Sequence, residues 1–131
     1  MTTLTLIEYR TGTTTTVGSS TSTVVSFDVS NSAPGGVAFT NCAIFVTGIV
    51  TGFDGTNNKS AGEMIAAQFQ VVSGVLAQVT PTDTIVNVID NTTGTPNSDF
   101  TAVGSVISFR ITGVAAAMSW FGKCEYVIYQ P

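Results

Sequence analysis

The fold is decided by a stretch near the end of the chain, TAVGSVISFRITGVAAAMSWFGKCEYVIY, which runs from Thr101 to Tyr129. In its first half the apolar side chains share one face of an extended chain: Val103, Ile107, Phe109 and Ile111. Ser108 and Arg110 fall on the other face. Alternation with a period of two is typical of a half-buried antiparallel strand.

The second half of this stretch has bulky side chains on both faces. One face carries Trp120, Cys124, Tyr126 and Ile128, and the other carries Phe121, Lys123, Glu125, Val127 and Tyr129. Such a strand is expected inside a sheet, or with one face against a partner. A connection of small residues, 113–117, joins the two halves. We predict a hairpin here, with the rest of the core built against it.

Composition indicates one all-β domain that spans residues 1–131. The chain has 22 Thr, a β-branched and half-polar residue that suits a pleated surface with one wet side. Only four residues are Lys or Arg and eight are Asp or Glu, and no long segment repeats apolar residues at helical spacing. A surface with so few charges predicts a permanent assembly, because a monomer of this kind tends to self-associate.

The charge pattern excludes several classes of partner. A net charge of −4 disfavours nucleic acid, which needs clustered Lys and Arg. No signal peptide is recognisable at the start, and no apolar run approaches the ~20 residues of a membrane-spanning helix. We therefore expect a soluble protein that is made in a cytoplasm.

Strands are also expected at residues 4–9, 25–29, 42–50, 63–72, 75–79 and 84–90. Segment 63–72 contains good helix formers, but its apolar residues alternate, which favours a strand. Segment 42–50 is apolar on both faces and is placed in the middle of a sheet. The total of about eight strands predicts an antiparallel β-sandwich of the jelly-roll type, with an immunoglobulin-like sandwich as the second choice.

The first 23 residues allow two interpretations. Segment 10–23 is rich in Thr and has low complexity, with glycine breaks. It is either an exposed loop or edge strand, or an arm that lies across a neighbouring subunit. In the second case the candidate contact residues are Thr13, Thr14, Thr15 and Thr16.

Turns are expected at 31–36 and 53–60, and the Asp54-Gly55 pair favours a tight turn with positive φ. Asp54, Asn57 and Asn58 do not match the spacing of an EF-hand calcium site. Cys42 and Cys124 are interpreted as small buried hydrophobic residues rather than a disulfide. Without histidine, two cysteines cannot complete a zinc site. We predict no metal and no cofactor.

No residue set amounts to a catalytic site, and we predict that the chain is not an enzyme. The absence of histidine removes an imidazole base and a Ser-His-Asp triad. Several acids lie among turn residues, where local backbone hydrogen bonds explain them. The aromatic residues of the last strand have two interpretations, core packing or a contact surface that binds sugars or a subunit. The candidate interface residues are Trp120, Phe121, Tyr126 and Tyr129.

From Ala43 to Tyr129 the chain resembles a β-rich module of tailed-bacteriophage virion proteins, found in small head proteins and in tail-fibre ends. The matching segments are AIFVTGIVTG, a polar DG turn, KSAGEMIAAQFQVV, GVLAQV, VISFRITG and SWFGKCEYVIY. They cover about two thirds of the chain, and the first 40 residues carry no resemblance.

The resemblance implies a structural virion protein. A chain that starts at its own Met, with no fibre shaft or repeat, is similar to a free-standing capsid decoration or cement protein. Such a protein is expected on the capsid exterior, often as a homotrimer, bound to the major capsid protein. A receptor-binding tail-fibre module or a carbohydrate-binding β-module is the alternative.

Overall fold

The computed structural model describes residues 3–31, 39–79, 83–92 and 94–131. Within them the chain forms nine β-strands and one short 3-10 helix, η1 (Val29–Asn31). The strands are β1 (Leu4–Thr16), β2 (Thr21–Asp28), β3 (Cys42–Asp54), β4 (Lys59–Val72), β5 (Val75–Gln78), β6 (Thr84–Asp90), β7 (Asn97–Val103), β8 (Val106–Thr112) and β9 (Met118–Gln130). Most of the turn predicted at 31–36 lies outside the described residues.

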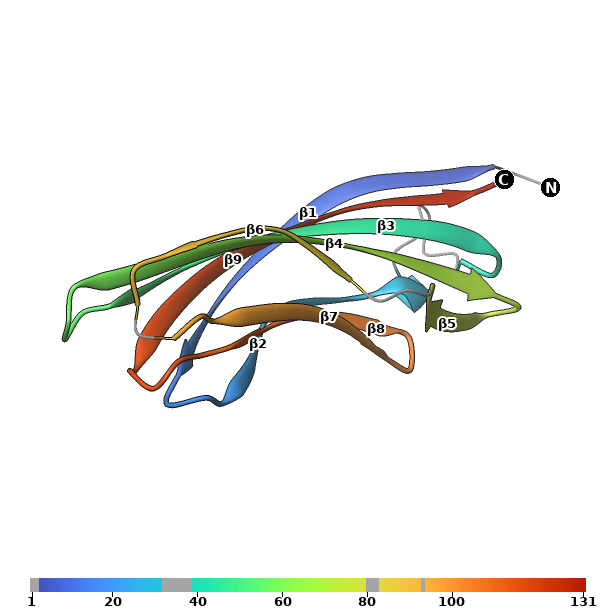
Figure 1. Ribbon diagram of the computed structural model, residues 1–131. Helices are drawn as coiled ribbons and strands as arrows, with labels where there is room; N and C mark the ends of the chain where they lie inside the picture. The colour runs from blue at the N-terminus through green and yellow to red at the C-terminus, as the bar shows by residue number, and fades with distance from the viewer. Residues whose placement is uncertain (1–2, 32–38, 80–82, 93) are drawn as a thin grey trace.

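The strands form two antiparallel sheets that face each other (Figure 1). The larger sheet has the order β1-β9-β3-β4-β5, with β6 also paired to β4, and the smaller has the order β2-β8-β7. The smaller sheet covers one face of the larger one, and none of the described strands forms a second layer on the opposite face. The prediction of an all-β antiparallel sandwich is confirmed.

The predicted hairpin of the last two strands is wrong. β8 belongs to the smaller sheet and β9 to the larger, so residues 113–117 cross from one sheet to the other. The physical reason is that both strands carry an apolar face. When the strands lie in opposite sheets, Phe109 of β8 and Trp120 of β9 are both buried in one shared core.

The strands with two apolar faces are central in the larger sheet, as predicted. β9 lies between β1 and β3, and β3 lies between β9 and β4. Segment 63–72 lies in β4, so its interpretation as a strand is confirmed. β5 follows as the hairpin return, through a turn in which Ser73 and Gly74 both have positive φ. Two positive φ values are typical of the type I′ hairpin turn.

The structure has nine strands rather than eight because the segment around Gly104 turns. Gly104 has a φ of +60°, which glycine adopts at no steric cost. The chain therefore reverses between β7 and β8. Val103, the last residue of β7, is 78% exposed instead of lying on the apolar face of one long strand. β7 begins at Asn97, at the end of a segment, 91–98, whose sequence is rich in turn-forming residues.

The turn between β3 and β4 also differs from its prediction, because Asn58, not Gly55, has the positive φ. Asp54 accepts hydrogen bonds there from the backbone N–H groups of Thr56 and Asn57. The Asn57 side-chain amide also donates to Asp54, and this bond, with smaller contributions from the two backbone bonds, holds the pKa of Asp54 below its usual value. The Asp54 carboxylate therefore stabilises the turn.

The core lies between the sheets and is rich in aromatic rings. Phe27 of β2 stacks on Tyr126 of β9 across the core, with ring centroids 3.9 Å apart. Phe100 and Phe109 stack within the smaller sheet at 4.9 Å. Cys42 and Cys124 are buried and free, which confirms their interpretation as small hydrophobic residues.

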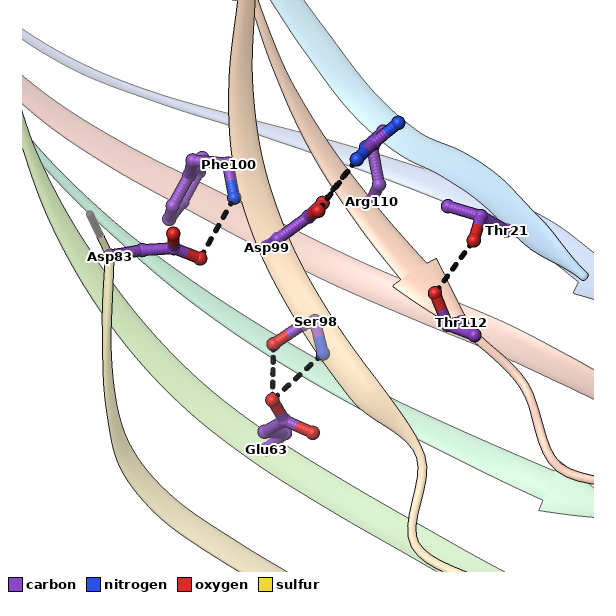
Figure 2. A network of polar contacts seen from close by, with 8 residues as sticks. All are labelled: Thr21, Glu63, Asp83, Ser98, Asp99, Phe100, Arg110 and Thr112. Carbon is purple, nitrogen blue, oxygen red and sulfur yellow. Dashed lines mark hydrogen bonds and ion pairs between the residues drawn. The ribbon is translucent and has the colours of Figure 1, made fainter. Parts of the chain in front are cut away.

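Polar contacts also join the two sheets along β7 (Figure 2). Glu63 of β4 accepts hydrogen bonds from the backbone N–H and the hydroxyl of Ser98, at 2.9 and 2.6 Å. Asp83, next to β6, accepts a bond from the Phe100 N–H at 3.2 Å. Each contact satisfies an N–H group at the free edge of β7, because β7 pairs only with β8 on its other side.

Candidate functional site

The uncovered face of the six-stranded sheet is the candidate functional site, and it is called the outer face below. Side chains of β3, β4 and β9 alternate between buried and exposed, as expected for strands covered on one side only. The buried side chains of these strands pack against the smaller sheet. The exposed apolar members of the outer face are Ile7, Tyr9, Phe45, Ile49, Phe53, Met64, Phe121, Val127 and Tyr129.

These side chains are neighbours because the strand register aligns them. Ile7 pairs with Val127, and Val127 pairs with Phe45, so three apolar side chains form a row across β1, β9 and β3. Beside this row, Tyr9, Thr47 and Glu125 help to line a hollow of about 380 Å³. A hollow with apolar walls can accept a side chain of a partner protein.

The two charged residues that β9 presents on this face neutralise each other. Lys123 donates a hydrogen bond to Glu125, with 2.7 Å between Nζ and Oε1. The same Nζ lies 6.0 Å from the centre of the Tyr9 ring, at the limit of a cation–π contact. The central strand of the outer face therefore adds no net charge to an otherwise apolar and Thr-rich surface.

The structure divides the predicted interface residues between the surface and the core. Phe121, Tyr129, Thr13 and Thr15 lie exposed on the outer face. The remaining four do not belong to an exposed surface: Trp120, Tyr126 and Thr16 are buried, and Thr14 is half-buried.

Each of these four inward side chains has a partner within the fold. Trp120 donates from Nε1 to the Thr16 hydroxyl at 2.9 Å. Thr14 shares a hydrogen bond with the Ser22 hydroxyl of β2. The Tyr126 hydroxyl donates to Glu8 at 2.7 Å and accepts from Arg10, and burial raises the pKa of Tyr126 to about 12.

Sequence reasoning missed the outer-face residues contributed by other strands, namely Ile7, Tyr9, Phe45, Ile49, Phe53 and Met64. The signal was present in segment 42–50, whose two apolar faces predicted only a central position in a sheet. Its second apolar face is the outer face itself. Periodicity identifies two apolar faces, but it does not show that one of them lacks a covering layer.

The arrangement offers contact area rather than reactive groups. Burial raises the pKa of the Cys124 thiol to about 12, so the thiol stays protonated at neutral pH and is a poor nucleophile. Within the described ranges, no three His, Cys, Asp or Glu side chains gather where they could hold a metal ion. The same part of the chain contains no helix that is long and apolar enough to cross a membrane.

Comparisons with known proteins support the fold. No family model matches the chain, and no curated protein matches it in sequence. Among solved structures it is similar to the tailspike protein of Acinetobacter baumannii phage AM24, with a TM-score of 0.50 and 10% sequence identity. The similarity covers 95% of this chain and 26% of the tailspike chain, so this chain spans about a quarter of the tailspike's length. At this identity the similarity establishes the fold alone.

Proposed function

We propose that the chain is a structural protein of a tailed-phage virion and that its outer face packs against another virion protein. The observation that carries this proposal is the set of nine exposed apolar side chains on one face of the six-stranded sheet. Soluble monomers rarely expose a continuous apolar surface of this kind, and such a surface marks a protein contact. Two further observations support the virion: the sequence resemblance and the shared fold of a phage tailspike.

Within the virion, our first assignment is a capsid decoration protein that binds the major capsid protein on the capsid exterior. The chain would be made in the host cytoplasm and recruited as a folded domain. An apolar, Thr-rich contact suits this role because it depends on buried area and hydrogen bonds, which salt screens only weakly. In this role the chain acts through binding and performs no enzymatic reaction.

The second assignment is a module of a tail fibre or tailspike that contributes to receptor binding. The observation that favours it is that the structurally similar chain is a tailspike. In that arrangement the outer face would pack against the rest of the fibre.

Copy number in purified virions separates the two assignments. Quantitative mass spectrometry should find the protein in many copies per particle, in a fixed ratio to the major capsid protein, if it decorates the capsid. A few copies per particle, released with the tails when heads and tails are separated, would support the tail assignment. Absence of the protein from purified virions would contradict the proposed function altogether.

A further inference from the structure

Within the described residues, β1 has an open edge along its N-terminal half, whereas its C-terminal half lies beside β2, with Gly12 against the Val24 carbonyl group. β1 has 13 residues and pairs with β9 over its whole length, without a register shift. No hydrogen bond joins a backbone group of β1 to any described residue outside β9. Figure 1 shows β1 along the margin of the larger sheet, with its N-terminal half clear of the smaller sheet.

The other edges are protected in ways that natural sheets commonly use. β5 has only 4 residues. The pairings of β2 and β6 are each interrupted by a register shift.

The edge of β7 is capped by side chains. Glu63 and Asp83 accept hydrogen bonds from the Ser98 and Phe100 N–H groups, so a foreign strand cannot use those donors (Figure 2). Glu63 is only 4% exposed, which fixes this cap inside the sandwich. No described side chain caps the backbone of β1 in this way, and its sequence contains no Pro and no Lys.

We propose that two copies of this chain pair through β1, antiparallel and about a twofold axis. Two identical edges can satisfy each other's free N–H and C=O groups only in a symmetric arrangement of this kind or in an open, growing one. The antiparallel arrangement closes on itself, so it gives a dimer rather than a fibre.

The charges of β1 select one register of this pairing. When Tyr9 lies opposite Tyr9 of the second copy, Glu8 of each copy lies opposite Arg10 of the other. Both side chains point to the same side of the strand and remain about half exposed. Unlike charges placed directly opposite stabilise an antiparallel pair, and like charges destabilise it.

Both charged side chains are already oriented for this contact. The Tyr126 hydroxyl donates to Glu8 and accepts from Arg10, and the two charges lie 3.8 Å apart within one copy. Charged residues on an edge strand usually prevent unwanted pairing. Here they disfavour two registers, the one that places Glu8 opposite Glu8 and the one that places Arg10 opposite Arg10. They favour the register between these two, in which Tyr9 lies opposite Tyr9.

Charge reversal gives a direct test. We expect the wild-type protein to be a dimer in light scattering across a range of concentrations. Glu8→Arg and Arg10→Glu each place like charges opposite each other twice in the dimer, and each should weaken the dimer at least about tenfold. An equimolar mixture of the two variants restores both unlike pairs, so it should form a heterodimer.

Lys59→Glu is the matched control, because it makes the same change of charge as Arg10→Glu at the exposed first residue of β4, away from β1. This control should remain a dimer, and circular dichroism should show that every variant is folded. A wild-type monomer at all concentrations, a trimer, or a dimer indifferent to both reversals would overturn the proposal. So would two weakened variants that fail to associate when mixed. These outcomes do not depend on whether the protein is found in virions.

Discussion

Adjacent threonines of β1 have opposite environments, although the sequence presents them as one uniform run. Thr16 is buried and accepts the Trp120 indole N–H, whereas Thr15 is exposed on the outer face. Composition predicted a solvent-exposed, Thr-rich surface. That prediction is correct for Thr15 but not for Thr16. The difference arises because successive residues of a strand point to opposite faces.

Replacing Thr16 with Val should destabilise the fold, because the isosteric side chain leaves the buried Trp120 N–H without a partner. The expected loss is about 1–3 kcal/mol in the free energy of unfolding. Thr15→Val is the control and should change this free energy by less than about 0.5 kcal/mol. Urea denaturation monitored by Trp120 fluorescence measures both, and equal effects of the two changes would contradict the assignment.

Stability should fall in alkaline solution because two buried groups resist ionisation. The pKa of Cys124 rises from 9.0 to about 12, and that of Tyr126 rises from 10.0 to about 12, mainly through burial. Below pH 9 both groups are protonated in the folded and unfolded chains, so their effect is constant. Above pH 9 the unfolded chain releases protons that the folded chain retains, and the stability they confer is lost as pH approaches 12.

A defined share of the stability lost at alkaline pH should come from Cys124. Cys124 alone should lower the free energy of unfolding by about 1.4 kcal/mol for each pH unit above its unfolded pKa. Urea midpoints measured between pH 8 and 11 should therefore fall less steeply in Cys124→Ala than in the wild type. A slope unchanged by this substitution would show that other groups cause the loss.

At the scale of elements, a glycine on the inner face of β3 sets how closely the two sheets approach. A Cβ at Gly48 would lie 2.7 Å from the ring of Phe109, too close for any real contact. The absent side chain therefore makes room for an aromatic ring of the smaller sheet. Sequence reasoning assigned β3 correctly as a central strand, but it did not predict this contact, because Phe109 is distant in the chain.

Gly48→Ala should force the Phe109 ring or the sheet to move, at a cost of about 1–3 kcal/mol in the free energy of unfolding. Gly62→Ala is the matched control on the outer side of β4, where the nearest atom to a new Cβ, the Val50 carbonyl oxygen, is 3.7 Å away. The control should be close to neutral. Thermal unfolding of both variants tests the difference, and a neutral Gly48→Ala would mean that the sheets are not tightly packed there.

The strands themselves were largely predictable, because alternation is a local property. The two largest errors in strand bounds lie at β7 and β8, where Gly104 divides one predicted strand into two, and at β1, which continues to Thr16. Both errors concern places where a strand ends. Strand ends depend on the conformation of one or two residues and on the pairing partner, and periodicity records neither.

At the scale of the molecule, the main feature is a sandwich whose larger sheet is covered on one face only, so that the outer face is exposed. A double substitution, Phe45→Thr with Phe121→Thr, should leave the fold intact, because both rings are about half exposed on the outer face. It should reduce binding of hydrophobic dyes and, under the proposed function, binding to phage particles that lack the protein, by about tenfold or more.

Val103→Thr is the control for this surface, since it removes an exposed apolar side chain from the end of β7 instead of the outer face. This variant should bind particles as the wild type does, in a co-sedimentation measurement. Equal binding by the double variant would exclude the outer face as the attachment surface.

The sequence by itself determined the fold class, the central positions of β3 and β9, and the burial of both cysteines. These properties follow from the composition of the chain and from the alternation of residues within single segments, both of which can be read without knowing the tertiary contacts. Only the tertiary structure decided which sheet each strand joins, which apolar face of β9 is buried, and that the N-terminal half of the β1 edge stays open. Those properties depend on contacts between distant segments, such as β1 with β9, and the pattern of an isolated segment does not specify its partner.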